Sequence, residues 1–310
     1  MVPAGKREAV LGVLDEEDVD YALSDETSGR DYTAVVTFPL PTTAVEPVLD
    51  RLREVGIERD AYTVVVRAET VVSKRFEALE GKYDADEEKE SGNGDRIARE
   101  ELVARASGMA LSVRPYVLMT AVSAIVATAG LLLDSPAVVV GSMVIAPLIG
   151  PAMAASVGTV VDDAELAVQG IKLQALGGVV AVGSAAAFAL LIRTANVVPL
   201  SAEEVFAINE VRERLAPDIL SLVIGLGAGA AGAVSLASGV SSALVGVMIA
   251  AALVPPTAVV GIGIAWGEPA TVLGSAVLVL VNVLAINLVA LIVLWRYGYR
   301  PRLWFREDDA

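Results

Sequence analysis

Two proline-rich clusters are the residues of this sequence whose types and spacing best suit chemistry. The first contains Pro147, Gly150 and Pro151, and the second contains Pro255 and Pro256, in segments that match at an offset of 105 residues. Proline has no backbone N–H, so a proline inside a helix frees a carbonyl in the preceding turn. In apolar surroundings, such a carbonyl either lines a polar cavity or pairs with a neighbouring helix. Because the cluster occurs twice, we expect two interrupted helices that build a binding site.

Four neutral polar side chains lie close to these clusters or in another apolar stretch. Ser142 and Thr257 flank the clusters, and Asn282 and Asn287 lie five positions apart further along the chain. Hydroxyls and amides coordinate ligands and also join helices, and we weight the two roles of the asparagines equally. The candidate substrate or ion site therefore comprises Ser142, Pro147, Gly150, Pro151, Pro255, Pro256, Thr257, Asn282 and Asn287.

The residue types exclude several kinds of chemistry. The chain contains no histidine and no cysteine, which removes imidazole catalysis, thiolate nucleophiles and Cys/His zinc sites. No pairing of a nucleophile with a base stands out, so we expect neither an enzyme nor a bound metal or cofactor. The run around Gly225 and Gly229 contains G-x-G-x-x-G, but it lies inside an apolar stretch and is interpreted as a helix-packing face.

Long apolar stretches must hold these residues in place. Hydrophobic residues make up 55% of the chain and the mean hydropathy is +0.63. A helix needs about 20 apolar residues to cross a bilayer. Six stretches of that length predict an α-helical multi-pass membrane protein in the lipid bilayer, with spans near 115–133, 137–160, 170–192, 219–237, 241–265 and 270–295.

The spans form an internal repeat. Residues 140–154 read VGSMVIAPLIGPAMA and residues 245–259 read VGVMIAAALVPPTAV, which align without a gap. The same offset places repeat one, residues 115–192, on repeat two, residues 219–295. Three spans per copy predict two inverted three-helix repeats, the architecture of many secondary transporters.

Charge divides the chain and predicts its orientation. Residues 1–110 carry 14 Lys and Arg against 25 Asp and Glu, a net charge of −11, whereas the whole chain has −15. This acidity argues against nucleic acid as a partner and favours a halophilic source. Lys and Arg concentrate on one side of the predicted spans, so the positive-inside rule places the N- and C-termini in the cytoplasm and the protein in the cell membrane.

The acidic head alternates between helical and strand periods. One helical pattern covers residues 6–14, and a second begins with a capping box at Thr43 and Glu46 and stops at Gly56. Strand patterns cover residues 20–24, 32–38 and 62–66. This order predicts a small α+β ferredoxin-like cytoplasmic domain at 1–72 that lacks its first strand. A charged helical linker at 73–110 and a transmembrane domain at 111–310 complete the expected organisation.

The run SPAVVVGSMVIAPLIGPAMAASVG, its partner VGVMIAAALVPPTAVVGIGIAWG and the head segment ETSGRDYTAVVTFPLP resemble one known family. This is the domain of unknown function 389, uncharacterised hydrophobic-domain membrane proteins of archaea and bacteria, and the acidity suggests a haloarchaeal member. The resemblance implies a multi-pass membrane protein and supplies no activity.

The repeat leads to one functional hypothesis and one alternative. We expect a transporter or channel-like protein for an unidentified small solute or ion, with the head as a regulatory or assembly domain, and we expect the chain to form a homo-oligomer. The alternative is a non-transporting membrane-anchored sensor or scaffold, whose head binds a ligand or partner.

Overall fold

The computed structural model describes residues 1–3, 5–25, 32–57, 63–66, 76, 79–80, 82, 96–109, 112–197, 199–239 and 243–300. The chain divides into two compact units, Met1–Glu101 and Leu102–Ala310, which we call the head and the body. The predicted charged run at 84–95 and the chain after residue 300 lie outside the described residues.

The head is a small antiparallel sheet covered by two helices. The elements are β1 (Val2–Pro3), α1 (Arg7–Glu16), β2 (Ala22–Asp25), β3 (Tyr32–Thr37) and α2 (Thr42–Glu54), and the strand order is β1-β3-β2. Both neighbours of β3 are antiparallel to it, with Val2 opposite Ala34 and Leu23 opposite Val36. Apolar residues of α1 and α2 pack together with Ala34 into one core. The sheet therefore has a strand at the chain start, where none was expected.

Two local expectations for the head are wrong. Residues 63–66 form no strand, and Val64 and Val66 are 77% and 80% exposed. The capping box does not form because α2 begins at Thr42, which puts Thr43 inside the first turn, and the Glu46 carboxylate instead pairs with Arg96 at 3.2 Å. Burial of this carboxylate is the largest cause of its pKa shift, and it raises the pKa of Glu46 above its usual value.

Buried charges in the head are matched with cations. The Glu17 side chain is 11% exposed, contacts the Arg51 guanidinium and accepts from Lys82 Nζ at 2.7 Å. A buried carboxylate with two cationic partners avoids the cost of an uncompensated charge. These ion pairs tie the end of α1 to α2 and to Lys82.

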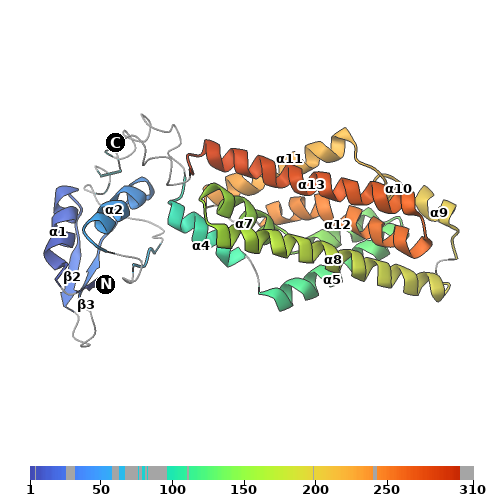
Figure 1. Ribbon diagram of the computed structural model, residues 1–310, viewed down its shortest axis with the longest axis horizontal. Helices are drawn as coiled ribbons and strands as arrows, with labels where there is room; N and C mark the ends of the chain where they lie inside the picture. Colours follow the sequence, from blue (N-terminus) through green and yellow to red (C-terminus); the bar gives the residue numbers. More distant parts are fainter. Residues whose placement is uncertain are drawn as a thin grey trace. The chain divides into compact units, whose positions relative to one another are not determined.

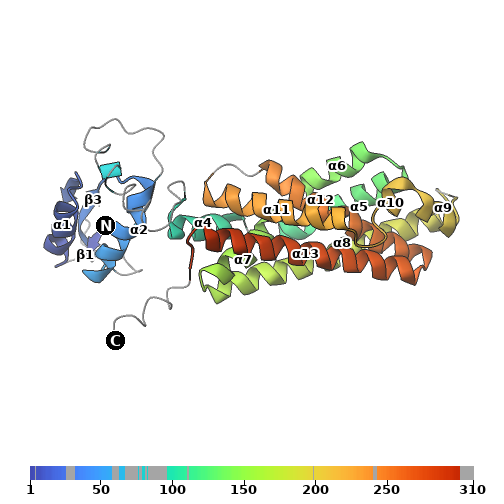
Figure 2. The same cartoon turned by 90° about the horizontal axis from the view of Figure 1, so that it is seen from above.

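The body is a bundle of apolar helices (Figures 1 and 2). After α4 (Arg99–Met109) come α5 (Val113–Leu132), α6 (Pro136–Ile145), α7 (Ile149–Val160), α8 (Ala164–Thr194), α9 (Ala202–Ala207), α10 (Asn209–Arg212), α11 (Ile219–Ala237), α12 (Ala243–Trp266) and α13 (Pro269–Arg296). Among the described residues, five helices are long and apolar enough to cross a bilayer, and the bent pair α6 and α7 adds a sixth if the two helices form one span. The molecule is therefore a membrane-embedded helical protein.

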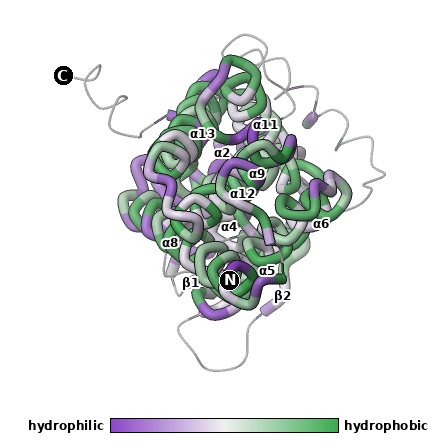
Figure 3. Tube along the Cα trace, turned by 90° about the vertical axis from the view of Figure 1, so that its right-hand side faces the viewer, coloured by the Kyte–Doolittle hydropathy of each residue, from purple (hydrophilic) through white to green (hydrophobic). Residues whose placement is uncertain are grey.

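Side-chain types follow the environments that a membrane protein needs. Seen end-on, the body helices are coloured mostly as hydrophobic, with hydrophilic segments among them (Figure 3). Large apolar side chains on α8, α11 and α13 are exposed, among them Val179, Leu190, Leu220, Leu273 and Leu284. Such surfaces suit contact with lipid, because a soluble protein rarely exposes contiguous apolar patches of this extent.

The two ends of the body differ. The helix α4 lies at one end, whereas α9 and α10 lie at the other (Figures 1 and 2). The segment before α11 contains two short helices, α9 and α10, with the non-helical residue Ile208 between them. Ser201 and Glu204 form a capping box at the start of α9, and Val205 and Val211 bury their side chains in the bundle. We call these the α4 end and the α10 end.

Candidate functional site

The first proline cluster breaks its helix as expected. The helix α6 stops at Ile145, α7 starts at Ile149, and the two axes differ by 52°. Ala146, which precedes Pro147, has ψ 119°, because a proline disfavours helical ψ in the residue before it. Pro151 is in the first turn of α7, where a backbone N–H has no helical partner in any case. The interruption is therefore a new helix start, not a kink.

The second proline cluster does not break its helix, which corrects our expectation. The helix α12 is continuous from Ala243 to Trp266 through Pro255 and Pro256. Pro256 removes the donor that would reach the carbonyl of Ala252, and Asn282 Nδ2 of α13 donates to that oxygen at 2.8 Å. In the first segment, the position of Ala252 is occupied by Pro147, and a proline there removes one more donor. The side-chain donor and the missing proline together explain why only one of the two helices breaks.

A cavity of about 80 Å³ lies between the break and the prolines of α12. Its lining comes from α5, α7, α8, α12 and α13 together with Leu148 of the break, and it is mostly apolar. Three lining residues are polar, namely Thr120, Gln174 and Thr257. The Thr257 hydroxyl donates to Leu253 at 2.6 Å within its own helix. Thr120 is only 3% exposed, and its side chain interacts with the Tyr116 hydroxyl one turn earlier in α5.

An amide pair lies beside the cavity. Asn287 Nδ2 of α13 donates to Gln174 Oε1 of α8 at 3.0 Å, and Gln174 Nε2 returns a bond to Asn287 Oδ1 at 3.3 Å. Gln174 Nε2 also reaches the carbonyl of Pro151 at 3.3 Å, and the Ser156 hydroxyl donates to Asn287 Oδ1 at 3.3 Å. We call Gln174, Asn287 and Ser156 the amide cluster. It joins three helices through neutral groups that both donate and accept.

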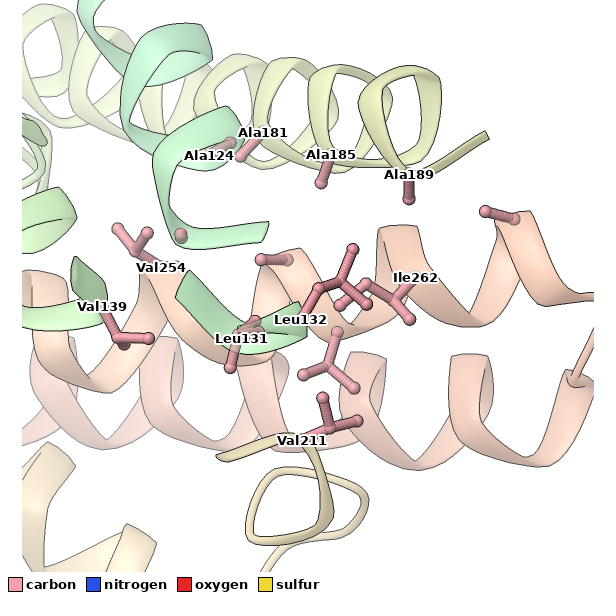
Figure 4. Packing of buried hydrophobic residues seen from close by; sticks show 14 of the residues in the cluster. Ala124, Leu131, Leu132, Val139, Ala181, Ala185, Ala189, Val211, Val254 and Ile262 are labelled. Carbon is pink, nitrogen blue, oxygen red and sulfur yellow. The ribbon is translucent and has the colours of Figure 1, made fainter. Parts of the chain in front are cut away.

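An apolar cluster closes the opposite side of the cavity. Ala124, Ala181 and Val254 line the cavity and also belong to a buried cluster that continues to Leu131, Ile262 and the residues of α9 and α10 (Figure 4). Because α8 runs towards α9, Ala181 lies nearer the α10 end than Gln174 does. The cavity therefore has an apolar side facing the α10 end and the amide cluster on the side facing the α4 end.

The α10 end is tied to the bundle by several contacts. Trp266 Nε1 donates to the carbonyl of Leu200 at 3.3 Å, and the Arg193 guanidinium lies 5.9 Å from the centre of the Trp266 ring. The Ser275 hydroxyl donates to the carbonyl of Arg214 at 2.7 Å. The segment that carries α9 and α10 is thus packed onto the span ends as a cap.

The structure separates the residues that the sequence grouped together. Thr257 lines the cavity, and Pro147 and Pro151 lie next to lining residues. Ser142 is fully buried, and its hydroxyl donates to Val139 within α6, so it does not face the cavity. Asn282 and Asn287 have different partners, on α12 and on α8 with α7 respectively.

The other predicted residues lie along helix contacts. Gly150 is buried at the start of α7. A side chain at Gly229 would meet the backbone of Ile286, and one at Gly225 would meet Asn282, so both glycines face α13.

Sequence reasoning missed Thr120 and Gln174. Both are single polar residues inside predicted spans, a position where polar groups need partners. Gln174 is 105 positions before Val279, which is also a lining residue. That combination of polarity, depth and repeat position is the signal that could have identified it.

The site can bind, but it lacks the groups for acid–base chemistry. Among the described residues that line the cavity, none is Asp, Glu, Lys or Arg. No group of three or more acidic, His or Cys residues able to hold a metal occurs in the described ranges. The groups available to a ligand are hydroxyl, amide and backbone oxygen and nitrogen.

Comparison with known proteins gives two matches. The sequence model of the family described as "Domain of unknown function (DUF389)" matches residues 143–288, which include both proline clusters. An uncharacterized protein of Methanocaldococcus jannaschii is 34% identical over 265 residues, which cover 86% of this chain and 77% of that protein. No solved structure matches the chain.

Proposed function

This chain belongs to the DUF389 family, whose description gives no activity, and we propose that it is a membrane transporter or channel-like protein for a small solute. The cavity beside the α6–α7 break is the proposed binding site. A broken helix next to a cavity near the middle of the spans is a common arrangement in secondary transporters.

The repeat offset of the cavity lining is the observation that carries this proposal. Eight of the thirteen lining residues form four pairs whose members are 105 positions apart. The pairs are Leu148 with Leu253, Ala152 with Thr257, Gln174 with Val279, and Gly178 with Val283. A cavity lined by unrelated residues would not be expected to contain several pairs at the 105-residue offset of the sequence repeat. The offset pairs support a site at the axis that would relate two copies of a three-helix unit.

Contacts at the span ends support an inverted arrangement of the two units. Asp134, just after α5, accepts from the backbone N–H of Glu210 at 3.1 Å, at the α10 end. Gly239, just after α11, accepts from Arg105 Nη1 of α4 at 2.9 Å, at the α4 end. Asp134 and Gly239 are equivalent positions of the two copies, because they are 105 residues apart, and they lie at opposite ends of the body. With the positive-inside rule, the α4 end faces the cytoplasm of a protein in the cell membrane.

We assign the head a regulatory or assembly role on the cytoplasmic side. Its strand order β1-β3-β2 with two helices corresponds to a ferredoxin-like unit without the last strand. Folds of this kind serve many functions, so the role rests on position and not on fold.

Flux through reconstituted protein tests the proposal. Gly178 lines the cavity, and a Cβ added there meets no atom within 4 Å, so Gly178→Leu fills the cavity without a clash at its first carbon. Gly183 on the same helix also has open space at its Cβ but does not line the cavity, which makes Gly183→Leu a matched control. We expect protein-dependent flux of at least one solute in a panel of ions, amino acids, organic anions, polyols and urea. Gly178→Leu should reduce it about tenfold or more, and Gly183→Leu should not.

Continuity of α12 gives weight to a second function, the non-transporting sensor or scaffold. Because α12 is continuous through Pro255 and Pro256, the second copy of the repeat has no helix break that could act as a hinge. This reading predicts no flux for any member of the panel. It also predicts that Pro151→Ala and Pro256→Ala change only stability.

A further inference from the structure

We propose that the cavity holds part of a hydrocarbon chain of a membrane lipid, which enters from the bilayer through an opening between α8 and α13. This inference rests on the binding site of the proposed function and names a ligand for it. A bound chain and a transported solute would compete for the same space, so lipid occupancy would regulate transport. Three features support the inference: the side on which the cavity opens, the surface around that opening, and the chemistry of the lining.

The lining is buried on one side of the cavity and accessible on the other. The lining residues that come from α5, α7 and α12 are all buried. By contrast, Gly178 of α8 and Val279 and Val283 of α13 are partly exposed. The accessible side of the cavity therefore lies between α8 and α13.

The helices α8 and α13 flank this opening without filling it. The helix α8 packs on α5, α7 and α12, whereas α13 packs on α7, α11 and α12. The hydrogen-bonded amides of Gln174 and Asn287 bridge α8 and α13. A Cβ added at Gly178, one turn beyond Gln174, meets no atom within 4 Å. The opening therefore lies on the α10 side of the amide pair.

Lipid-facing side chains surround the opening. Val179, Leu280 and Leu284 each follow a lining residue in the sequence, and they are 72%, 56% and 59% exposed. In a membrane-embedded protein, such side chains contact the hydrocarbon chains of the bilayer. The cavity is thus continuous with the lipid-facing surface, and the bilayer supplies the molecule that can reach it.

The chemistry of the lining selects an apolar ligand. Ten of the thirteen lining residues are Ala, Gly, Leu or Val. Gln174 donates both amide N–H groups to α7 and α13, and the Thr257 hydroxyl donates within α12. The Thr120 side chain interacts with the Tyr116 hydroxyl. An apolar cavity stays dry, because a buried water needs about two to four polar partners, whereas a hydrocarbon chain needs none.

Packing drives the binding of a chain. Lipid chains are as apolar as leucine, so moving a chain from the bilayer into the cavity gains little from the hydrophobic effect. An empty cavity leaves its lining without van der Waals contacts, and a chain supplies them. The cavity of about 80 Å³ exceeds the roughly 10–15 Å³ that one water needs by the same measure. It therefore admits a short segment of a chain and not an entire lipid.

Photocrosslinking in a bilayer tests the inference. The full chain is reconstituted into phosphatidylcholine vesicles in which a small fraction of the lipid carries a diazirine at the end of one chain. After illumination, mass spectrometry locates the crosslinked residues. We expect crosslinks to Gly178, Val279 and Val283, in addition to those at Leu280 and Leu284, which any surrounding lipid can reach.

Two variants block the opening, and each has a matched control. Gly178→Leu adds bulk at the opening, and Gly183→Leu adds the same bulk elsewhere on α8, where a Cβ also meets nothing within 4 Å. Val283→Phe narrows the opening from α13, and Leu284→Phe enlarges its exposed neighbour. Each blocking variant should lower the crosslink at Val279 about fivefold or more, because a filled cavity leaves no room for a chain. The controls should leave that crosslink unchanged.

Crosslinks at the exposed Leu280 provide the internal reference, because they report insertion into the bilayer and do not require the cavity. They should be equal in all four variants. Since the two blocking variants act from different helices, either one decides the test if the other does not fold.

The outcomes distinguish the inference from the proposed function. Crosslinks confined to exposed residues, or equal crosslinks at Val279 in blocking variants and controls, would overturn the lipid inference, and the flux assay would still decide transport. A disulfide-linked dimer of Val279→Cys in the bilayer would show that a second copy of the chain covers the opening, which would also overturn it. Crosslinks in the cavity without flux of any solute would support the inference and overturn transport.

Discussion

At the scale of single residues, side-chain amides replace the backbone donors that proline removes. Asn282 reaches across from α13 to the carbonyl of Ala252, the oxygen that Pro256 leaves without its helical partner. Asn282 is 2% exposed, so neither group has water as a substitute. One amide therefore replaces the backbone donor that Pro256 removes from α12.

A double-mutant cycle between Asn282 and Pro256 tests this account. Asn282→Ala should destabilise the protein by about 1–3 kcal/mol, because the Ala252 carbonyl is left buried without a donor. Pro256→Ala restores a backbone N–H for that carbonyl, so Asn282→Ala should cost less in the Pro256→Ala background. Unfolding in detergent measures both, and we expect a coupling of about 1 kcal/mol.

One outcome of the double-mutant cycle would contradict this account. If the two substitutions have additive effects, Asn282 does not act through the carbonyl that Pro256 leaves open. Its free side-chain oxygen, which has no partner among the described residues, would then be the more important atom.

At the scale of elements, glycines set the distance between α11 and α13. A Cβ built at Gly229 lies 2.4 Å from the carbonyl oxygen of Ile286, closer than any real Cβ contact. At Gly227, two residues away on the same helix, a Cβ meets nothing within 4 Å. The close approach is therefore local to one side of α11.

Alanine substitutions at these two glycines should have different effects on the stability of the body. Gly229→Ala must push α13 away and should destabilise the body by about 1–3 kcal/mol. Gly227→Ala gains helix propensity without a clash, so it should be neutral or stabilise slightly. Melting temperatures of the detergent-solubilised variants provide the comparison. Equal behaviour of the two variants would mean that α11 and α13 are not packed as described.

The sequence predicted the spans well because length and hydropathy decide them. Each expected stretch of the body agrees with a helix or the bent pair to within a few residues, except that α8 begins six residues earlier at Ala164. The strand predicted at 62–66 is wrong over the described residues 63–66, where three valines in a row satisfy strand propensity but no strand forms. Strand propensity shows that a segment can adopt an extended conformation, but it does not show whether a neighbouring strand is available to pair with it.

The site was predictable only in part, for a related reason. The effect of a proline depends on partners from other helices. Pro147 breaks its helix, whereas Pro256 does not, because Asn282 is within reach of only one of the freed carbonyls. Sequence distance between Asn282 and Pro256 gives no indication of that contact. Thr120 and Gln174 became site residues through the same kind of tertiary placement.

At the scale of the whole molecule, the two three-helix units are placed so that corresponding helices have corresponding neighbours. The first helix of each unit packs on the third, α5 on α8 and α11 on α13, and the middle helices pack on the third helices of both units. Such an exchange of partners is what a two-fold relation between the units would produce. In the proposed arrangement, the cavity lies between the two three-helix units.

Cysteine labelling from the two sides of the membrane tests the inversion directly, since the chain has no native cysteine. Ser135 begins α6 and Ser238 follows α11, so the two serines mark the ends of the first helix in each unit. A membrane-impermeant maleimide added to intact cells should label Ser135→Cys, whereas Ser238→Cys should react only after the membrane is opened. Permeabilised cells should label both, which controls for the reactivity of each site. Labelling of both cysteines from outside intact cells would place the units in the same orientation. The offset pairs around the cavity would then have no two-fold axis in the membrane plane, and alternating exposure of the cavity would lose its structural basis.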